Sequence, residues 1–509
     1  MTTAAPQIDL NYGLDDVPKP FPKALGLGLQ HVLTMFGATI AVPLLLGPAM
    51  EMDTTQIAIL ISSVFIASGV ATILQVTIGT RLPIVQGVSF AFLGPFFAII
   101  GAHSGAQAMQ YIAGAILLGA VVEAAIGFSG LVGVLRRYIT PVVIGPVIAL
   151  IGLSLYGAAS GQVSAVTDDQ GNVVQSSNWW IAILTFSLVF LFALVLSRRS
   201  RMLSLFPILL AVVTAYVVAL IFSEIGVITE ANRAYVSFST IGDSFGGAPW
   251  VRNVVGERAL FFPWGMPLFD VGFFVAILAA YLASIIESFG DYHAVARVSG
   301  AGDPTPRQIN RGIGAEGLGC AFTGLVGGFA STSYSENIGL VGLTKVASRY
   351  VVLVGATALI LLGFITKIGA IIATIPAPIV GGIYMALFGL IAAVGLSNLL
   401  RADMSSQRNL LIAGFVLFMG LVVPNYMGTL PQEWTLGGQT WLTNLARSIF
   451  GSGIAVGALL GLILDNLIPG SPAERGIVPD TDLAFEPDEA RRAERGTDDA
   501  AGGDGHPAP

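Results

Sequence analysis

The chain has 509 residues, of which 54% are hydrophobic and only 11% are charged, and its net charge is -7. Soluble domains carry about 25% charged residues, so this composition excludes a soluble globular protein. The acidic balance, without a basic patch, also excludes a nucleic-acid-binding protein. The single cysteine, Cys320, excludes an internal disulfide.

A helix needs about 20 apolar residues to cross the hydrocarbon core of a bilayer. We predict 14 membrane segments. In the first half of the chain they are Ala24–Leu46, Gln56–Ile78, Ile84–Ile100, Met109–Phe128, Ile139–Tyr156, Trp179–Leu196 and Leu203–Phe222. In the second half they are Val271–Val295, Ile313–Phe329, Asn337–Ala347, Val351–Ile365, Ile379–Val394, Leu410–Val423 and Ile449–Leu467. The third and the tenth are short and interrupted.

Basic residues indicate the orientation, because cytoplasmic loops are enriched in Lys and Arg. With a cytoplasmic N-terminus, 19 of the 24 Lys and Arg fall on the cytoplasmic side. We therefore predict a multi-pass protein of the cell membrane with both termini in the cytoplasm. The predicted organisation is an N-terminal tail (1–22), a first half (23–222), an outer loop (223–270), a second half (271–467) and an acidic, disordered tail (468–509).

Two segments resemble each other. Pro141–Gly152 and Pro378–Gly389 share six of twelve residues at a constant offset of 237. They are the fifth and twelfth segments, seven apart, so the two halves would face opposite ways. The interrupted third and tenth segments are also seven apart. We predict an inverted repeat with a substrate site at its broken segments, as in many secondary transporters; a chance match of Gly-rich sequence is the alternative.

Ionisable residues within membrane segments are costly, so each one is a candidate functional residue. The first cluster, in the eighth segment, contains Glu287, Asp291 and His293. Glu287 and Asp291 are four residues apart and share one helix face. The alternative for Asp291 and His293 is a hydrated helix end. A metal site from these three side chains has no further ligand, and we predict neither a metal nor another cofactor.

The second cluster surrounds the tenth segment, where a Ser- and Thr-rich stretch runs into a short helix near Glu336. The start of a helix offers unpaired backbone N–H groups and a positive dipole end. Tyr334, Glu336 and Asn337 are therefore candidates for substrate binding. The structural alternative is that Ser335 and Asn337 only cap this helix.

Other candidates lie in the first, third and ninth segments. In the third segment, Ser89 and Phe90 can offer backbone groups and an aromatic face, with plain packing as the alternative. Gln30 and His31 lie in the first segment, where a buried, hydrogen-bonded histidine is the alternative. Glu316 lies in the ninth segment, near a helix start where it can also be structural.

These groups together favour one class of substrate. Carboxylates accept hydrogen bonds from ring N–H groups, backbone N–H groups donate to ring carbonyls, and an aromatic side chain stacks on a flat ring. Burial disfavours the charged form of a carboxylate, so such a group can bind and release a proton. We therefore predict a neutral, flat, hydrogen-bonding substrate and proton coupling.

Three stretches carry a resemblance to a known family. Leu29–Thr39 is similar to the first helix of the nucleobase–ascorbate transporter family, which includes bacterial uracil and xanthine permeases. Glu287-Ser-Phe-Gly-Asp291-Tyr resembles its eighth-helix motif. Glu336-Asn-Ile-Gly-Leu-Val-Gly-Leu-Thr-Lys345 matches its signature, Gln/Glu/Pro-Asn-x-Gly-x4-Thr-Arg/Lys/Gly.

The resemblance implies an all-α polytopic fold of 14 segments in two inverted repeats of seven, with short strands in segments 3 and 10. Segments 1–4 and 8–11 would form a core domain, and 5–7 and 12–14 a gate domain through which family members form homodimers. Glu287 and Glu336 would hold the base, Ser89 and Phe90 would contact and stack on it, and Asn337 would support the site. Supporting or proton-coupling positions would be Gln30, His31, Asp291 and Glu316.

The implied function is alternating-access symport of a proton with a nucleobase, either uracil or xanthine or another purine. Glu336 is similar to the uracil-type signature, whereas Glu287 followed by Asp291-Tyr resembles the purine and ascorbate branches, so the base stays open. The alternative is an anion transporter of the same fold, for ascorbate, sulfate or bicarbonate, against which the two carboxylates argue. A channel would need a continuous polar pore, and an enzyme a nucleophile–base pair or a metal set, and the sequence indicates neither.

Overall fold

The computed structural model describes residues 9–132, 138–168, 170–199, 203, 205–256, 258–431 and 433–477. Most of the acidic tail predicted at 468–509 therefore lies outside the described residues. The helices of the first half are α1 (Phe21–Ala49), α2 (Thr54–Thr77), η1 (Phe90–Phe92), α3 (Leu93–Ile100), α4 (Gly105–Ser129), α6 (Pro141–Leu153), α7 (Tyr156–Val163), α8 (Trp179–Phe190), η2 (Leu191–Val195), η3 (Leu196–Arg198), α9 (Pro207–Glu224) and α10 (Phe238–Gly247).

The helices of the second half are α11 (Val271–Val298), α12 (Pro306–Val326), α13 (Ser335–Thr344), α14 (Arg349–Phe364), α15 (Thr366–Ile372), α16 (Ala377–Leu399), α17 (Gln407–Thr429), α18 (Thr440–Phe450) and α19 (Gly453–Leu467). The strands are β1 (Gln86–Val88), β2 (Val166–Thr167), β3 (Val173–Gln175) and β4 (Ser331–Ser333).

Within the described residues, nine helices are long and apolar enough to span a membrane, or ten if the bent pair α18–α19 counts as one span. This is a multi-pass membrane protein. Each of the 14 predicted segments overlaps a helix or a broken segment, but α14 is short and α12 is too polar to pass the same test. The exact number of spans and the inverted repeat stay predictions.

Several predicted segments differ from the observed elements. Helix α12 begins at Pro306, seven residues before the predicted start, because a reciprocal cap between Thr305 and Gln308 stabilises a polar first turn. The last segment is bent by 84° between α18 and α19. The outer loop 223–270 contains α10, which the sequence did not predict.

The third and tenth segments contain the strand pair that the resemblance implies. β1 pairs antiparallel with β4, with Gln86 opposite Ser333 and Val88 opposite Ser331. All six strand residues are buried. Extended backbone at membrane depth is stable only where other groups satisfy its N–H and C=O, and this pairing satisfies them inside the protein.

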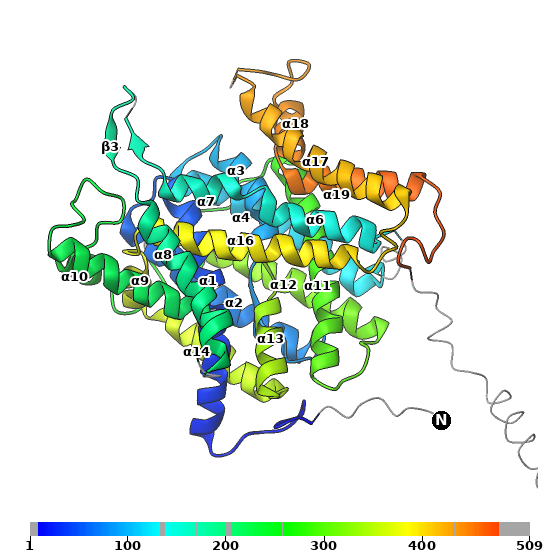
Figure 1. Ribbon diagram of the computed structural model, residues 1–509, viewed down its shortest axis with the longest axis horizontal. Coiled ribbons are helices and arrows are strands. Elements are labelled where there is room, and N and C mark those ends of the chain that lie inside the picture. Colours follow the sequence, from blue (N-terminus) through cyan, green and yellow to red (C-terminus); the bar gives the residue numbers. More distant parts are fainter. Residues whose placement is uncertain are drawn as a thin grey trace, which may run out of the picture.

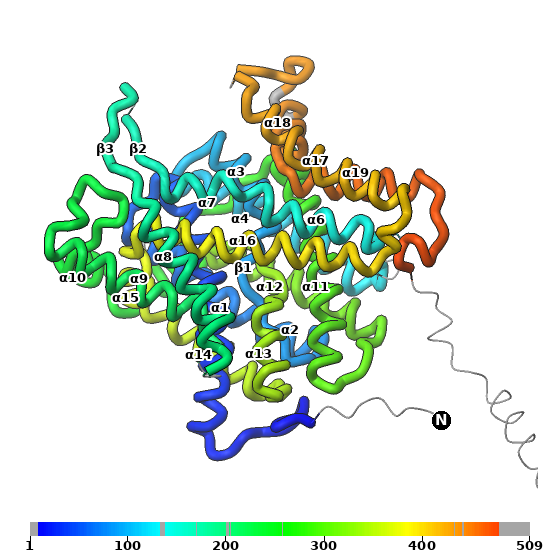
Figure 2. The backbone as a smooth tube through the Cα atoms, viewed as in Figure 1, coloured from blue at the N-terminus to red at the C-terminus, as the bar shows by residue number. Residues whose placement is uncertain are grey.

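The strand pair lies near the middle of the molecule, where β1 is visible beside α16 (Figure 2). Helix α16 crosses the centre of the view with α6 beside it, while α17 and α19 lie together at the upper right (Figure 1). Helices α1, α2, α12, α13 and α14 fill the lower half (Figure 1). Helix α2 is mostly covered by protein, whereas α8, α9 and α17 present apolar side chains outward, as lipid-facing helices do.

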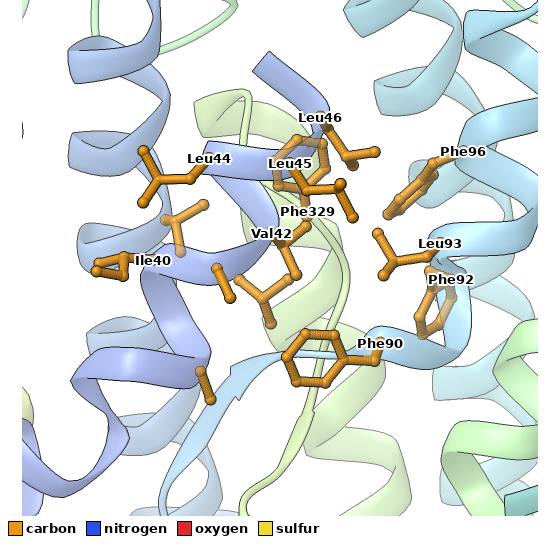
Figure 3. Close-up of a cluster of buried hydrophobic side chains, with 14 of the residues drawn as sticks. Ile40, Val42, Leu44, Leu45, Leu46, Phe90, Phe92, Leu93, Phe96 and Phe329 are labelled. Atoms are coloured by element: carbon orange, nitrogen blue, oxygen red, sulfur yellow. The ribbon is translucent and has the colours of Figure 1, made fainter. Parts of the chain in front are cut away.

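The largest apolar cluster packs around the third segment. In Figure 3, Val42, Leu45 and Leu46 of α1 lie on the side of Leu93 and Phe96, while Ile40 and Leu44 point away from them. All five side chains of α1 belong to this cluster. Phe90 lies at the end of the strand β1, below the same cluster (Figure 3). The cluster fixes the position of the strand pair and of the helix that follows it.

Candidate functional site

Two short helices begin at the two ends of the strand pair. β1 leads into η1 and α3, while β4 leads into α13. Because the strands are antiparallel, the N-termini of α3 and α13 lie at opposite ends of the pair and direct their positive dipole ends toward it. The first N–H groups of α13 lack helical partners. At the other end, the Ala91 N–H already donates to Ser89 and the Leu93 N–H to the carbonyl of Phe90, so the free backbone donors lie at the start of α13.

Helix α11 lines the strand pair with polar side chains. Asp291 is buried and accepts two hydrogen bonds, from the hydroxyl of Ser333 at 2.7 Å and from that of Ser335 at 2.8 Å. The hydrated helix end, which was the alternative for Asp291, is therefore wrong. The alternative in which Ser335 only caps α13 is also wrong, because its hydroxyl donates to Asp291 and the residue before α13, Tyr334, makes no side-chain cap.

Glu316, in the middle of α12, has no exposed surface. Its Oε1 accepts a hydrogen bond from the Ser284 hydroxyl at 2.8 Å. Its Oε2 accepts from the hydroxyls of Ser288 at 2.6 Å and Tyr292 at 3.0 Å. The three donors lie four residues apart on α11 and thus on one helix face. They replace the water that a charged carboxylate would otherwise need.

A chain of hydroxyls joins the two carboxylates. The Ser288 Oγ, which donates to Glu316, lies 3.1 Å from the Ser333 Oγ, which donates to Asp291. The Thr332 Oγ1 also lies 3.1 Å from Ser288. Asp291 and Glu316 are therefore linked through strand β4 by a row of hydroxyls. Because each hydroxyl has one proton, Ser288 and Ser333 can hydrogen-bond to each other only when one of them no longer donates to its carboxylate.

Glu287 and Glu336 differ from Asp291 and Glu316 in burial and in hydrogen bonding. Both are only partly buried, and the two carboxyl groups lie close enough to interact electrostatically. No hydrogen bond or ion pair joins the Glu287 carboxylate to any part of the chain that the structure describes. For Glu336, no other described residue donates to the carboxylate. Both keep acceptors free for a molecule from outside.

The amide of Asn337 holds α13 against α1. Its Nδ2 donates to the backbone carbonyl of His31 at 2.9 Å and lies 3.3 Å from the His31 Nδ1. Asn337 therefore does not cap its helix. Its Oδ1 is buried and has no partner among the described residues. Gln30 is partly exposed, and its backbone carbonyl accepts from Thr34.

The aromatic candidates take different places. The ring of Phe90 packs edge-on against Phe388, with centroids 5.6 Å apart, and the buried Ser89 accepts from the N–H of Ala91. The Tyr334 hydroxyl donates to the carbonyl of Val88 at 3.1 Å. Both rings are buried, Phe90 at 8% and Tyr334 at 4% exposed.

Sequence reasoning missed two buried polar side chains. Glu123, in α4, is 1% exposed, and neither carboxyl oxygen has a hydrogen-bond partner among the described residues. The side-chain amide of Gln86, in β1, is also buried without such a partner. Glu123 was detectable as a glutamate within an apolar segment, whereas nothing in the sequence marks Gln86.

The arrangement combines free carboxylates, the free N-terminus of α13 and an aromatic ring beside a buried polar network. Such a set can bind a small molecule that both donates and accepts hydrogen bonds. The described residues include no group of three or more His, Cys, Asp or Glu side chains that could hold a metal ion.

Comparison with known proteins identifies relatives along nearly the whole chain. The sequence model described as "Permease family" (Xan_ur_permease) matches residues 22–429. The chain is 38% identical to solute carrier family 23 member 2 of Mus musculus, over 92% of this chain and 76% of that protein. It is 32% identical to nucleobase-ascorbate transporter 2 of Arabidopsis thaliana, over 90% of this chain and 88% of the plant protein.

Two solved structures share the fold. The transmembrane domain of the cyanobacterial bicarbonate transporter BicA has a TM-score of 0.52 at 14% identity and covers 89% of this chain and 99% of that domain. The murine solute carrier 26 family member A9, an anion transporter in the inward-facing state, has a TM-score of 0.55 at 13% identity, over 89% of this chain and 69% of that protein. These likenesses show the fold alone. The match to the permease model and the identity to the mouse and plant transporters show that the chain belongs to the nucleobase–ascorbate transporter family.

Proposed function

We propose that this protein is a secondary active transporter that carries a nucleobase, either uracil or xanthine or another purine, together with a proton. The observation that carries this proposal is the pair Glu287 and Glu336. They are two neighbouring, partly buried carboxylates without donors from other side chains of the described chain. Ring N–H groups of a base would supply those donors.

The surroundings of the pair support a flat substrate. The ring of Phe90 packs nearly perpendicular to that of Phe388, which fixes its position on one side. An aromatic pair of this kind offers a π-face for stacking. The N-terminus of α13 carries Glu336 and offers backbone N–H groups for ring carbonyls.

The buried network supports proton coupling. Asp291 lies one turn from Glu287 on α11, and a row of hydroxyls links it to Glu316. Substrate binding changes the charge and hydration of Glu287, which interacts electrostatically with Asp291, Glu316 and Glu336. A carboxyl group in this set would take up a proton with the base and release it on the other side, as alternating access requires.

The arrangement of the protein in the cell is part of the same proposal. The chain would lie in the plasma membrane with both termini in the cytoplasm, following its loop charges. Segments 1–4 and 8–11 would form the core domain that carries the site, and 5–7 and 12–14 the gate domain and a homodimer contact. His31 and Gln30 would support the site from α1.

An anion transporter is the alternative, and the fold neighbours include anion transporters. At 13% and 14% identity they carry no information on substrate. Two unpaired carboxylates would repel an anion, whereas they attract N–H donors.

The test is uptake of radiolabelled uracil and of radiolabelled xanthine by cells that express the chain, with and without a protonophore. Glu51→Gln, in the exposed turn after α1, is the matched control for Glu287→Gln and Glu336→Gln. We expect accumulation of one base by the native chain and the control, abolished by the protonophore and by either site variant.

Uptake that survives the protonophore would contradict proton coupling. Membrane-inserted protein that takes up neither base would contradict these two substrates. Ascorbate, urate and then inorganic anions would follow in the same assay, and uptake of an anion unaffected by Glu287→Gln would favour the alternative.

A further inference from the structure

Glu123 is a buried carboxyl group that the candidate substrate site does not use. It lies in α4, 1% exposed, and both carboxyl oxygens lack a hydrogen-bond partner among the described residues. None of the ion pairs of the described chain includes it. An ionised carboxylate without donors or a cation is among the most costly groups in a protein interior. Glu123 is therefore neutral in this conformation and carries a proton.

Helix α4, which carries Glu123, packs unusually closely on α12. A methyl group at Gly317 of α12 would lie 2.5 Å from the backbone nitrogen of Ala124, and one at Gly127 would lie 2.1 Å from that of Gly314. Such distances leave no room for a side chain between the two backbones. Glu123 is adjacent to one of these contacts and one turn from the other, so it lies in the part of α4 that packs most closely on α12.

Glu316, next to Gly317 on α12, is the acidic partner across this contact. The two carboxyl groups interact electrostatically, and their surroundings are opposite. Glu316 accepts hydrogen bonds from three hydroxyls, whereas Glu123 accepts none. Donors stabilise a charge and their absence disfavours it. The pair therefore holds one proton, on Glu123, and one negative charge, on Glu316.

The other titratable groups that face Glu123 come from α11 and α12. They are Tyr281, Tyr292 and Cys320, each of which interacts electrostatically with it. Each already donates elsewhere: Tyr281 to the carbonyl of Ile116, Tyr292 to Glu316 and Cys320 to the carbonyl of Ser331. None of the three carries a positive charge that could stabilise an ionised Glu123. Glu316 is the carboxyl group with which Glu123 interacts, and it is therefore the partner for exchange of a proton.

We propose that Glu123 and Glu316 form a proton-sharing carboxyl pair, and that Glu123 stores the proton which this pair exchanges with the hydroxyl chain leading to Asp291. The two carboxyl groups make no hydrogen bond to each other in this conformation, so the exchange requires a change of side-chain rotamer that brings a carboxyl oxygen of Glu123 within hydrogen-bond distance of Glu316. The O–H bond of Glu123 then breaks as an O–H bond forms on Glu316. The negative charge passes from Glu316 to Glu123, and the total charge of the pair is unchanged.

The exchange has a consequence for strand β4. When Glu316 becomes neutral, Ser288 loses its charged acceptor and its hydroxyl is free to turn toward Ser333. The location of the proton is thereby linked to the strand that leads into the substrate site. The use of the pair in transport rests on the proposed function, whereas the existence of the pair does not.

The test uses infrared spectroscopy on the purified full-length protein, without any substrate. A protonated carboxyl group gives a carbonyl-stretch band that a carboxylate or an amide does not. We expect this band in the native protein and in the control Glu51→Gln, and its loss in Glu123→Gln. Glutamine has the size of neutral glutamic acid and needs no proton, so it should fold. Glu123→Asp keeps a carboxyl group and should shift the band, which keeps the test decisive if the glutamine variant does not fold.

Transport supplies the second readout. A pH gradient of about one unit, acting through one proton, supports about tenfold accumulation of the substrate. We expect Glu123→Gln to lose this accumulation while still exchanging labelled for unlabelled base, because the base contacts stay intact. Glu123→Asp should restore part of it.

Each outcome decides a separate point. An unchanged infrared band in folded Glu123→Gln would overturn the pair. If Glu123→Gln loses the band but keeps full accumulation, the proton of Glu123 does not exchange with the transport path. That is the result expected of a glutamate with a purely structural role. A native protein that shows the band but accumulates no base would contradict the proposed function and leave the pair standing.

Discussion

Helix α11 presents two carboxylates, Glu287 and Asp291, one turn apart and in opposite surroundings. Asp291 accepts hydrogen bonds from Ser333 and Ser335, and one helix away Glu316 accepts three. Glu287 accepts none from the described chain and lies partly exposed beside Glu336. The protein has thus satisfied one set of carboxylates internally and left the other open.

This difference separates groups that hold the fold together from groups that bind. Leaving a polar group without a partner costs free energy that only an external molecule can return. Removing an open carboxylate should therefore affect binding and not stability, while removing a satisfied one should affect stability first. Four substitutions test this distinction.

The largest effect on binding is expected for Glu287→Gln. A hydrogen bond to a charged group contributes about 1.5–3 kcal/mol, which corresponds to roughly 10–150-fold in affinity. Equilibrium binding of labelled base to purified protein measures it, with Glu51→Gln as control. The melting temperature should not change. A large loss of thermal stability would show that Glu287 has an internal partner.

For Glu316→Gln we expect the opposite pattern, a loss of thermal stability rather than of base affinity alone. The glutamine amide turns an acceptor into a donor opposite hydroxyls that already donate, and an unsatisfied buried group costs about 1–3 kcal/mol. Thermal unfolding in detergent should show a clear fall in melting temperature, measured beside Glu287→Gln. Equal stability of the two variants would contradict the distinction.

Ser288→Ala removes the hydroxyl between Glu316 and Ser333. The expected loss of stability is about 1 kcal/mol, the net value of one hydrogen bond, and the pH dependence of transport should flatten. Ser129→Ala, at the exposed end of α4, is the control. A Ser288→Ala protein with native pH dependence would exclude this hydroxyl from the proton path.

The smallest effect is expected for Phe90→Leu. Leucine keeps the apolar volume and loses the aromatic face, which contributes about 0.5–1.5 kcal/mol to a ring contact. Base affinity should fall roughly twofold to tenfold. Phe415→Leu, on the outward face of α17, tests for a general effect of the substitution. Unchanged affinity would mean that Phe90 only packs against Phe388.

The order of segments and the candidate site residues were readable from the sequence because they follow strong local signals. Long apolar runs predict spans, and isolated charges inside them mark Glu287, Asp291 and Glu316. The pairing of β1 with β4 came from the family resemblance, since three-residue strands have no periodicity to detect.

The partners of these residues were not readable. The sequence offered capping of α13 as an alternative role for Ser335, yet its hydroxyl donates to Asp291, a contact that depends on how α11 packs against α13. Glu123 was passed over because one glutamate hardly changes the mean hydropathy of its segment. Only the contact between α4 and α12 makes it exceptional.

The most direct test of the central claim is accumulation of labelled base by the purified protein in sealed liposomes with an imposed pH gradient. We predict that uracil or xanthine accumulates only when the outside is the more acidic, and that Glu287→Gln abolishes accumulation while Glu51→Gln does not. Accumulation that ignores the pH gradient, or that survives Glu287→Gln, would contradict it.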